Sequence, residues 1–134
     1  MKLDSNDVFV LYGIFEWSTN PEAKKKSAVI CNGIICYSKD QEEKLTGSMT
    51  DKFGDSALEE IEMSDTEFTF VRRLSSNLTH RFRFKKQEVN QKPVWVGFYE
   101  SPMLGKNSAW AVLTPVPAIL FERLGMAKIC KLPE

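Results

Sequence analysis

The stretch from Ser64 to Lys86 reads SDTEFTFVRRLSSNLTHRFRFKK. Apolar and polar side chains alternate on both sides of a short Ser/Asn segment, which is the pattern of two β-strands joined in a hairpin. A slip of one residue would set arginines against phenylalanines along the whole ladder, so the register that keeps the aromatic side chains together is favoured. With Ser76–Leu78 as the loop, the predicted opposing pairs are Phe70–Phe84, Arg72–Phe82 and Leu74–His80.

This hairpin has two chemically different faces, because successive side chains of a strand point to opposite sides. The inner face is predicted to be aromatic, with a cation and the single histidine of the chain near the loop: Phe68, Phe70, Phe82, Phe84, Arg72 and His80. The outer face is predicted to be basic, formed by Arg73, Arg81, Arg83 and Lys85. The pattern therefore indicates a sheet with one buried aromatic side.

The rest of the chain repeats this strand-and-turn pattern. Eight apolar or alternating runs are separated by polar breaks: Val8–Trp17, Lys26–Tyr37, Leu45–Asp51, Ala57–Met63, Thr66–Leu74, Thr79–Lys86, Pro93–Glu100 and Ser108–Thr114. Such spacing is typical of an up-and-down barrel or a sandwich. We predict an all-β fold, an antiparallel up-and-down β-barrel of about eight strands. It would form a single domain over residues 1–134, with at most one or two short helices, at Asn20–Lys26 and Ala118–Leu124. Inside the second run, Asn32-Gly33 predicts a tight turn or a bulge.

The net charge and the distribution of charge along the chain indicate which kinds of partner are expected. The 18 basic and 18 acidic residues give a formal net charge of zero, so nucleic acid is not an expected partner. The charges are nevertheless segregated: residues 39–67 hold ten acidic residues and three lysines, and residues 72–92 hold seven basic residues and one glutamate. This separation either orients a partner or lets neighbouring strands of opposite charge stabilise each other.

Three cysteines, Cys31, Cys36 and Cys130, fit no zinc-site spacing. Cys31 and Cys36 lie in an apolar run and are expected to be buried, and free thiols indicate a reducing compartment. The first residues lack the charged and apolar segments of a secretory signal, and no apolar stretch reaches membrane-spanning length. We therefore expect a cytoplasmic protein that does not associate with membranes.

Four motifs follow one another in a characteristic order. They are Gly13-Ile14-Phe15-Glu16-Trp17, the segment from Gly47 through Asp51 to Phe53-Gly54, the aromatic strands from Phe68 to Phe84, and Trp95-Val96-Gly97-Phe98-Tyr99. This order resembles the lipocalin-like barrels of the calycin group, although the early Gly-x-Trp of true lipocalins is absent. The resemblance implies a barrel that holds one small ligand. Independently, Gly47 and Gly97 inside strand patterns would permit the sharp coiling that barrel closure requires.

The candidate ligand site is the aromatic inner face around Arg72. An inward arginine bordered by phenyl rings could bind the carboxylate of an otherwise apolar ligand, because its planar fork matches two oxygens. Alternatively, it extends to the barrel rim and pairs with an acidic neighbour. His80 could be a catalytic base, a haem ligand or a structural hydrogen-bonding residue. The predicted ligand-binding residues are Arg72, His80, Phe68, Phe70, Phe82, Phe84, Trp17 and Trp95; no catalytic residue, metal site or cofactor is predicted.

Three further features carry alternatives. The basic outer face could grip phosphates, or it is a solvated, ion-paired strand face. Asp51 and Asp55 flank Phe53-Gly54, where an aspartate commonly caps its own turn. Glu16 would be a candidate general acid or base if it pointed inward.

Three functions follow as hypotheses. The first is a non-catalytic barrel that binds a small apolar or anionic amphipathic molecule in a cavity of roughly a few hundred Å³. The alternative is a protein–protein interaction module with a packed core and a charged binding face, and the third is an enzyme that uses Glu16 or His80. Both faces of Val8–Trp17 are apolar, so this strand needs a second cover. A homodimer is expected to provide it, unless a C-terminal segment does so.

Overall fold

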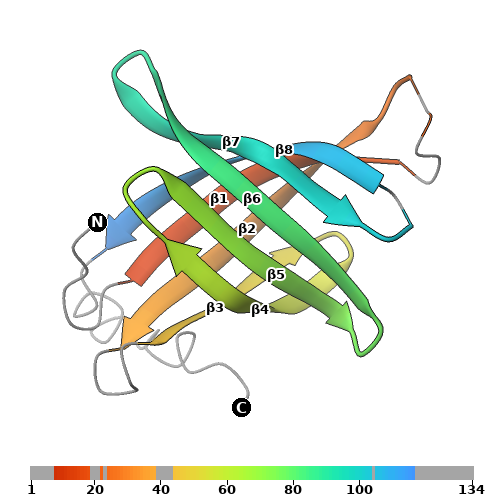
Figure 1. Cartoon of the computed structure of the whole chain (residues 1–134), viewed down its shortest axis with the longest axis horizontal. Helices are drawn as coiled ribbons and strands as arrows, with labels where there is room; N and C mark the ends of the chain where they lie inside the picture. The colour runs from red at the N-terminus through yellow and green to blue at the C-terminus, as the bar shows by residue number, and fades with distance from the viewer. Residues whose placement is uncertain (1–7, 19–21, 23, 39–43, 104, 117–134) are drawn as a thin grey trace.

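The computed structural model describes residues 8–18, 22, 24–38, 44–103 and 105–116, which form eight antiparallel strands and no helix. The strands are β1 (Val8–Trp17), β2 (Ser27–Ser38), β3 (Lys44–Asp51), β4 (Gly54–Met63), β5 (Glu67–Ser75), β6 (Leu78–Val89), β7 (Lys92–Ser101) and β8 (Gly105–Val116). Each strand pairs with the next, and β1 also pairs with β8, so that the sheet closes into a barrel (Figure 1). The predicted all-β barrel is therefore confirmed. The predicted helical window Ala118–Leu124 lies outside the described residues, as does part of Asn20–Lys26.

The hairpin formed by β5 and β6 keeps the predicted faces but not the predicted register. The observed opposing pairs are Phe68–Phe84, Phe70–Phe82 and Arg72–His80, two residues away from the prediction. The cause is the connection: β5 ends at Ser75, β6 begins at Leu78, and the ladder is irregular between Arg73 and Ser75. Because the shift is an even number of residues, every side chain still points to its predicted side.

The Asn32-Gly33 pair forms neither a turn nor a bulge, so that prediction is wrong. Strand β2 runs straight through it, with Asn32 opposite Tyr12 and Gly33 opposite Leu11 on β1. Gly33 marks a close approach of two backbones instead, since a Cβ there would lie 2.7 Å from the carbonyl oxygen of Ser48. The continuous ladder to β1 outweighs the local turn preference.

Side chains of complementary size fill the interior of the barrel. Large rings project inward from β5, β6 and β7: Phe68, Phe70, Phe82, Phe84, Trp95 and Tyr99. They meet a wall of small residues on β1, β2 and β8: Gly13, Cys31, Ala109 and Ala111. Phe70 stacks on Phe82 at a ring-centroid distance of 4.8 Å, and Phe15 meets Tyr99 edge-on at 5.3 Å. Bulky side chains on one side thus occupy the space that small ones leave on the other.

One tight backbone contact shapes the barrel at β7. Gly97 lies opposite Phe84 on β6, and a Cβ at this position would lie 1.8 Å from the carbonyl oxygen of Arg83. No side chain fits in this space, so β7 can approach β6 this closely only with glycine. The observed reason for glycine at this position is therefore the close approach of two backbones; the coiling that the sequence predicted for Gly97 stays a prediction.

Two of the three cysteines lie in described strands. Cys31 is buried and free, as expected, and burial raises the pKa of its thiol to about 11, which keeps it protonated. Cys36 is buried as well, but it is not a free thiol, so the expectation of free thiols is wrong at this position. Within the described residues, no helix is long and apolar enough to cross a membrane.

Candidate functional site

Arg72 and Asp51 form a buried ion pair at the barrel end where the β3–β4 and β5–β6 turns lie. Arg72 Nη1 lies 2.5 Å from Asp51 Oδ2, and the two side chains are 1% and 0% exposed. The guanidinium also donates from Nε to Ser56 Oγ at 2.9 Å and from Nη2 to the Gly54 carbonyl at 3.5 Å. Acceptors of the chain itself therefore hold the arginine in one orientation.

Asp51 has two tasks in this arrangement. Its Oδ1 accepts a hydrogen bond from the Phe53 backbone N–H at 2.8 Å, which is the predicted turn cap. Its Oδ2 takes the position beside Arg72 where a ligand carboxylate was expected. Of the two alternatives for Arg72, pairing with an acidic neighbour is the one observed, although the side chain is buried and does not extend into solvent.

His80 lies opposite Arg72 on β6 and is kept neutral by its surroundings. Burial lowers the pKa of His80 to about 4, and the positive charge of Arg72 adds to this effect. The imidazole stacks on the Tyr99 ring at a centroid distance of 5.3 Å. Among the described residues, its Nδ1 is the buried side-chain polar atom without a hydrogen-bond partner. We call Asp51, Ser56, Arg72, His80 and Tyr99 the polar end of the barrel.

Aromatic rings border the polar end. Trp17 and Phe53 lie with their ring centroids 5.1 Å apart, and Lys52 Nζ sits 4.9 Å and 5.1 Å from the two centroids. Tyr99 donates from its hydroxyl to the Glu16 carbonyl at 2.7 Å, and burial raises the pKa of this phenol to about 12. The Glu16 side chain is exposed, so the condition for a general acid or base at this position, an inward side chain, is not met.

The residues predicted to bind a ligand fall into three groups. Arg72 and His80 meet at the polar end. Five aromatic residues are core members with no more than 4% exposure: Phe68, Phe70, Phe82, Phe84 and Trp95. Trp17 lies at the rim and packs partly buried against the core. Their role in binding stays a prediction, and no local sequence pattern identified Asp51 and Ser56 as the partners of Arg72.

The cavity that the described residues line inside the barrel is small. Between the aromatic side and the small-residue wall lies a cavity of about 10 Å³, lined mainly by apolar groups of Leu11, Phe15, Cys31, Met49, Phe70 and Phe82. This is about the minimum space that one water molecule needs, and this cavity is far below the few hundred Å³ that the sequence-based hypothesis requires. Within the described part of the chain, no three His, Cys, Asp or Glu side chains gather as metal ligands.

The charged strands pair with one another on the outside of the barrel. Arg73 Nε on β5 lies 2.7 Å from Glu59 Oε1 on β4, and Arg81 Nη2 on β6 lies 3.8 Å from Glu60 Oε2. The hydrogen bond from Arg73 lowers the pKa of Glu59. These contacts match the alternative in which neighbouring strands of opposite charge stabilise each other.

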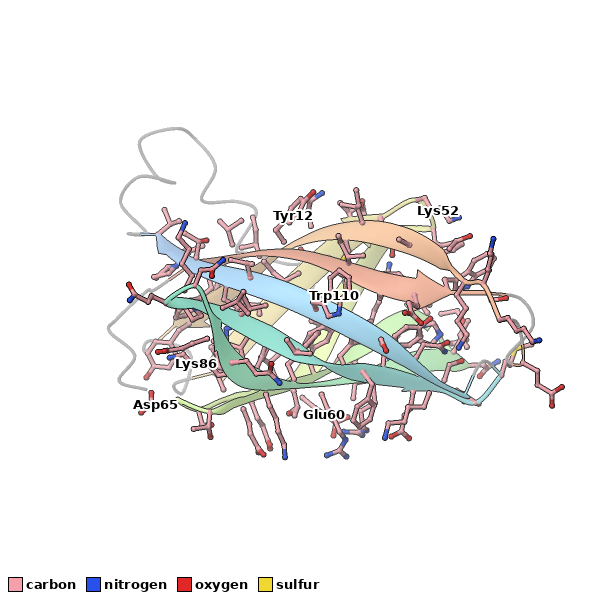
Figure 2. The ribbon with its side chains drawn as sticks, turned by 90° about the horizontal axis from the view of Figure 1, so that it is seen from above. Tyr12, Lys52, Glu60, Asp65, Lys86 and Trp110 are labelled. Carbon is pink, nitrogen blue, oxygen red and sulfur yellow. The ribbon has the colours of Figure 1, made fainter. Side chains whose placement is uncertain are left out.

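A second surface, on the other side of the barrel, is apolar. The register places Ile14 between Ile30 on β2 and Trp110 on β8, and Trp110 in turn lies opposite Val96 on β7. In the next row, Tyr12 lies opposite Val112. We call the outward side chains of these rows the apolar outer face: Tyr12, Ile14, Ile30, Val96, Trp110 and Val112. Figure 2 shows Tyr12 and Trp110 on the side formed by β1 and β8, with Glu60 at the opposite edge of the view.

The apolar outer face continues toward the other barrel end. There, Val8 and Cys36 are buried and pack with Val10, Ile34 and Val116 in a second hydrophobic cluster, separate from the barrel core. These residues belong to β1, β2 and β8, the strands that carry most of the apolar outer face. Three neighbouring strands are therefore apolar on both sides over most of their length.

Comparison with known proteins gives no relative: no family model, no curated protein and no solved structure matches this chain.

Proposed function

We propose that this protein is a non-catalytic binding module that recognises another protein through the outside of a filled barrel. The observation that carries the proposal is the apolar outer face. Four of its large apolar side chains, Tyr12, Ile30, Trp110 and Val112, are between 42% and 52% exposed although they lie on adjacent strands. Contiguous exposed apolar surface of this kind marks interaction sites on stable proteins.

The packing of the interior supports an external binding surface. An eight-stranded barrel either holds one small ligand or is filled by its own side chains, and the cavity between the aromatic rings and the small-residue wall has space for about one water molecule. The buried thiol of Cys31 and the buried phenol of Tyr99 both have raised pKa values, so neither is an ionised nucleophile near neutral pH. The groups at the core thus stabilise the fold.

The charged face is a weaker candidate for the interface than the sequence suggested. Arg73 and Arg81 already have carboxylate neighbours within the barrel. A partner would have to displace these contacts or leave them at its margin, where exposed ion pairs contribute about 0–1 kcal/mol. The side chains of the apolar outer face carry no charge, so a partner that covers them displaces no ion pair.

Hydroxyl-radical footprinting tests the proposal for any protein partner. The purified protein at high dilution is compared with the same protein labelled inside the cells that produce it. We expect Tyr12 and Trp110 to lose reactivity in the cell, while Met103, which is 76% exposed elsewhere on the barrel, stays reactive. If Trp110, like Met103, is as reactive in the cell as in the dilute protein, the proposal loses its basis.

A second candidate function is the binding of a small molecule at the polar end, in the manner implied by the lipocalin-like resemblance. The specific observation in its favour is His80 Nδ1, which is buried without a partner among the described residues, beside Arg72. An unpaired buried polar atom costs about 1–3 kcal/mol, so a ligand that hydrogen-bonds to it would be stabilised. The small volume of the cavity lined by the described residues favours a compact polar or anionic molecule over a fatty acid or haem.

A thermal-shift and native mass-spectrometry panel tests this second candidate. Small carboxylates, fatty acids and haem are compared on the native protein and on His80→Phe, which keeps a ring against Tyr99 but removes the nitrogen. The candidate requires a shift for a compact anion that disappears in His80→Phe. A panel without any such response, or with equal responses of both proteins, would eliminate it.

A further inference from the structure

We infer that the apolar outer face binds a second copy of this chain, giving a symmetric and weak homodimer. The inference rests on the proposed function, and it names the partner of that same surface. Its core is the row Ile30–Ile14–Trp110–Val96, which crosses four adjacent strands. Tyr12 and Val112 extend it along β1 and β8.

The chemistry of the face fits a copy of itself. All six of its side chains are uncharged, so a two-fold arrangement brings no like charges together at its centre. In a symmetric dimer the same patch lies on both sides of the interface and must be compatible with itself. A purely apolar patch meets this condition, whereas a patch of one charge sign requires a partner of the opposite sign.

The net charge of the chain does not oppose self-association. Copies that carry a large net charge repel each other and stay apart, but this chain has 18 basic and 18 acidic residues and a formal net charge of zero. The strong local charges of β4 to β6 lie away from β1 and β8, and two of their pairs are internally compensated. Lys85 on β6 lies opposite Val96, at the edge of the apolar outer face. Two copies can therefore approach through β1 and β8 without long-range repulsion.

The size of the face sets the strength of association. Four strands spaced about 4.8 Å apart and two rows about 7 Å apart give a patch of a few hundred Å², with its side chains included. A standard interface buries roughly 800 Å² per partner, and smaller ones belong to weak complexes. We therefore expect a monomer–dimer equilibrium with a dissociation constant of roughly micromolar order.

Aromatic side chains dominate the expected energy. Trp110 and Tyr12 are each 49% exposed in the monomer, and half-exposed aromatics near the centre of an interface are the residues most often found to be hot spots. Because the contact is apolar, moderate salt should leave it unchanged. An interface formed by the charged strands would weaken instead.

Sedimentation velocity of the purified full chain, from about 1 µM to about 500 µM, tests the inference over the range of weak complexes. We expect the native protein to shift from monomer to dimer. Trp110→Glu and Ile30→Lys should each raise the dissociation constant at least about 30-fold, the size of a typical hot-spot loss. Two variants provide redundancy, and circular dichroism confirms that each one folds.

Matched controls lie elsewhere on the barrel. Met103→Glu and Val89→Glu change side chains that are 76% and 51% exposed but lie outside the face, and they should dimerise normally. The double change Arg81→Glu with Arg83→Glu should also leave the dimer unchanged. A dimer that survives Trp110→Glu and Ile30→Lys, or that is lost in the controls, would overturn the assignment.

Two further outcomes separate this inference from the proposed function. A native protein that stays monomeric at all concentrations, while Trp110 is protected in cells, shows that the partner is a different protein and overturns the inference alone. Protection of Trp110 already in the dilute monomer would show that the same chain covers the face. That result would overturn both.

Discussion

His80→Phe should flatten the pH dependence of stability on the acid side. The folded protein holds His80 neutral with a pKa of about 4, whereas a solvent-exposed histidine has an ordinary pKa of 6.5. The unfolded chain therefore binds a proton that the folded chain refuses, and stability falls as pH drops through this window. The contribution is fully present above about pH 6.5 and is lost progressively toward about pH 4.

The magnitude follows from the two pKa values. A shift from 6.5 to about 4 corresponds to about 3 kcal/mol when the whole window is crossed. Between about pH 8 and about pH 5, His80 should account for roughly 2 kcal/mol of lost stability. Phenylalanine keeps a ring stacked on Tyr99, cannot be protonated, and removes the unpaired Nδ1. At neutral pH, we therefore expect His80→Phe to be neutral or stabilising.

Urea unfolding at a series of pH values, compared between the two proteins, measures this contribution directly. Carboxylates titrate in both proteins, so the difference between the two profiles isolates the histidine. The chain has one histidine, so a tag-free sample gives a single imidazole signal in NMR, and this signal should titrate near pH 4 in the folded state. Parallel stability profiles, or a folded-state titration near the ordinary histidine pKa of 6.5, would refute the reasoning.

Three further sets of substitutions test the barrel itself. Asp51→Asn and Arg72→Met should each destabilise the folded protein by about 3–5 kcal/mol, because each leaves a buried group unpaired. In denaturant unfolding, the double variant should lose much less stability than the sum of the two single losses. Additive losses would show that the pair is not coupled. Gly97→Ala should prevent folding or cost several kcal/mol of stability, because its Cβ would lie 1.8 Å from a backbone oxygen. As a control, Gly105→Asn should fold normally by circular dichroism, since Gly105 has a φ of 69° and open space around it. A stable Gly97→Ala would show that β6 and β7 can separate at this point. Phe82→Ala should cost about 3–5 kcal/mol of stability and open a dry cavity. In native mass spectrometry, this variant should bind benzene-sized apolar molecules, while the native protein binds none. Equal binding by the native protein would mean that its interior is not filled.

The alternation of residues 64–86 was enough to predict which side chains point inward. Phe68, Phe70, Arg72, His80, Phe82 and Phe84 are all buried as expected. The register was wrong because the irregularity near Leu74 shortens the connection, and local sequence gives no signal for it. A shift of two residues leaves every side chain on the same face. The assignment of side chains to faces was therefore correct, although the predicted residue pairs were wrong.

The candidate site depended on contacts that local pattern cannot give. Asp51 reads as a turn cap and does act as one, but its bond to Arg72 joins residues 21 positions apart. Similarly, the alternation predicted the inward rings without predicting whether they leave space between them. That outcome depends on Gly13, Ala109 and Ala111 across the barrel, and only the closed three-dimensional register brings these residues opposite the rings.

The same alternation is the structural basis of the proposed binding on the outside of the barrel. On β8, the inward Ala109 and Ala111 alternate with the outward Trp110 and Val112, and on β1 the inward Gly13 lies beside the outward Ile14. At these positions the two strands place small side chains in the core and large apolar ones toward solvent, the reverse of what burial alone favours. Strands β5 and β6 do the opposite, with rings inside and charges outside. Large apolar side chains on the outer face of β1 and β8 expose apolar area to water, and this exposure is unfavourable in free energy. A second apolar surface that covers Trp110 and its neighbours would recover this free energy, so the arrangement that places small side chains in the core also underlies the proposed interface.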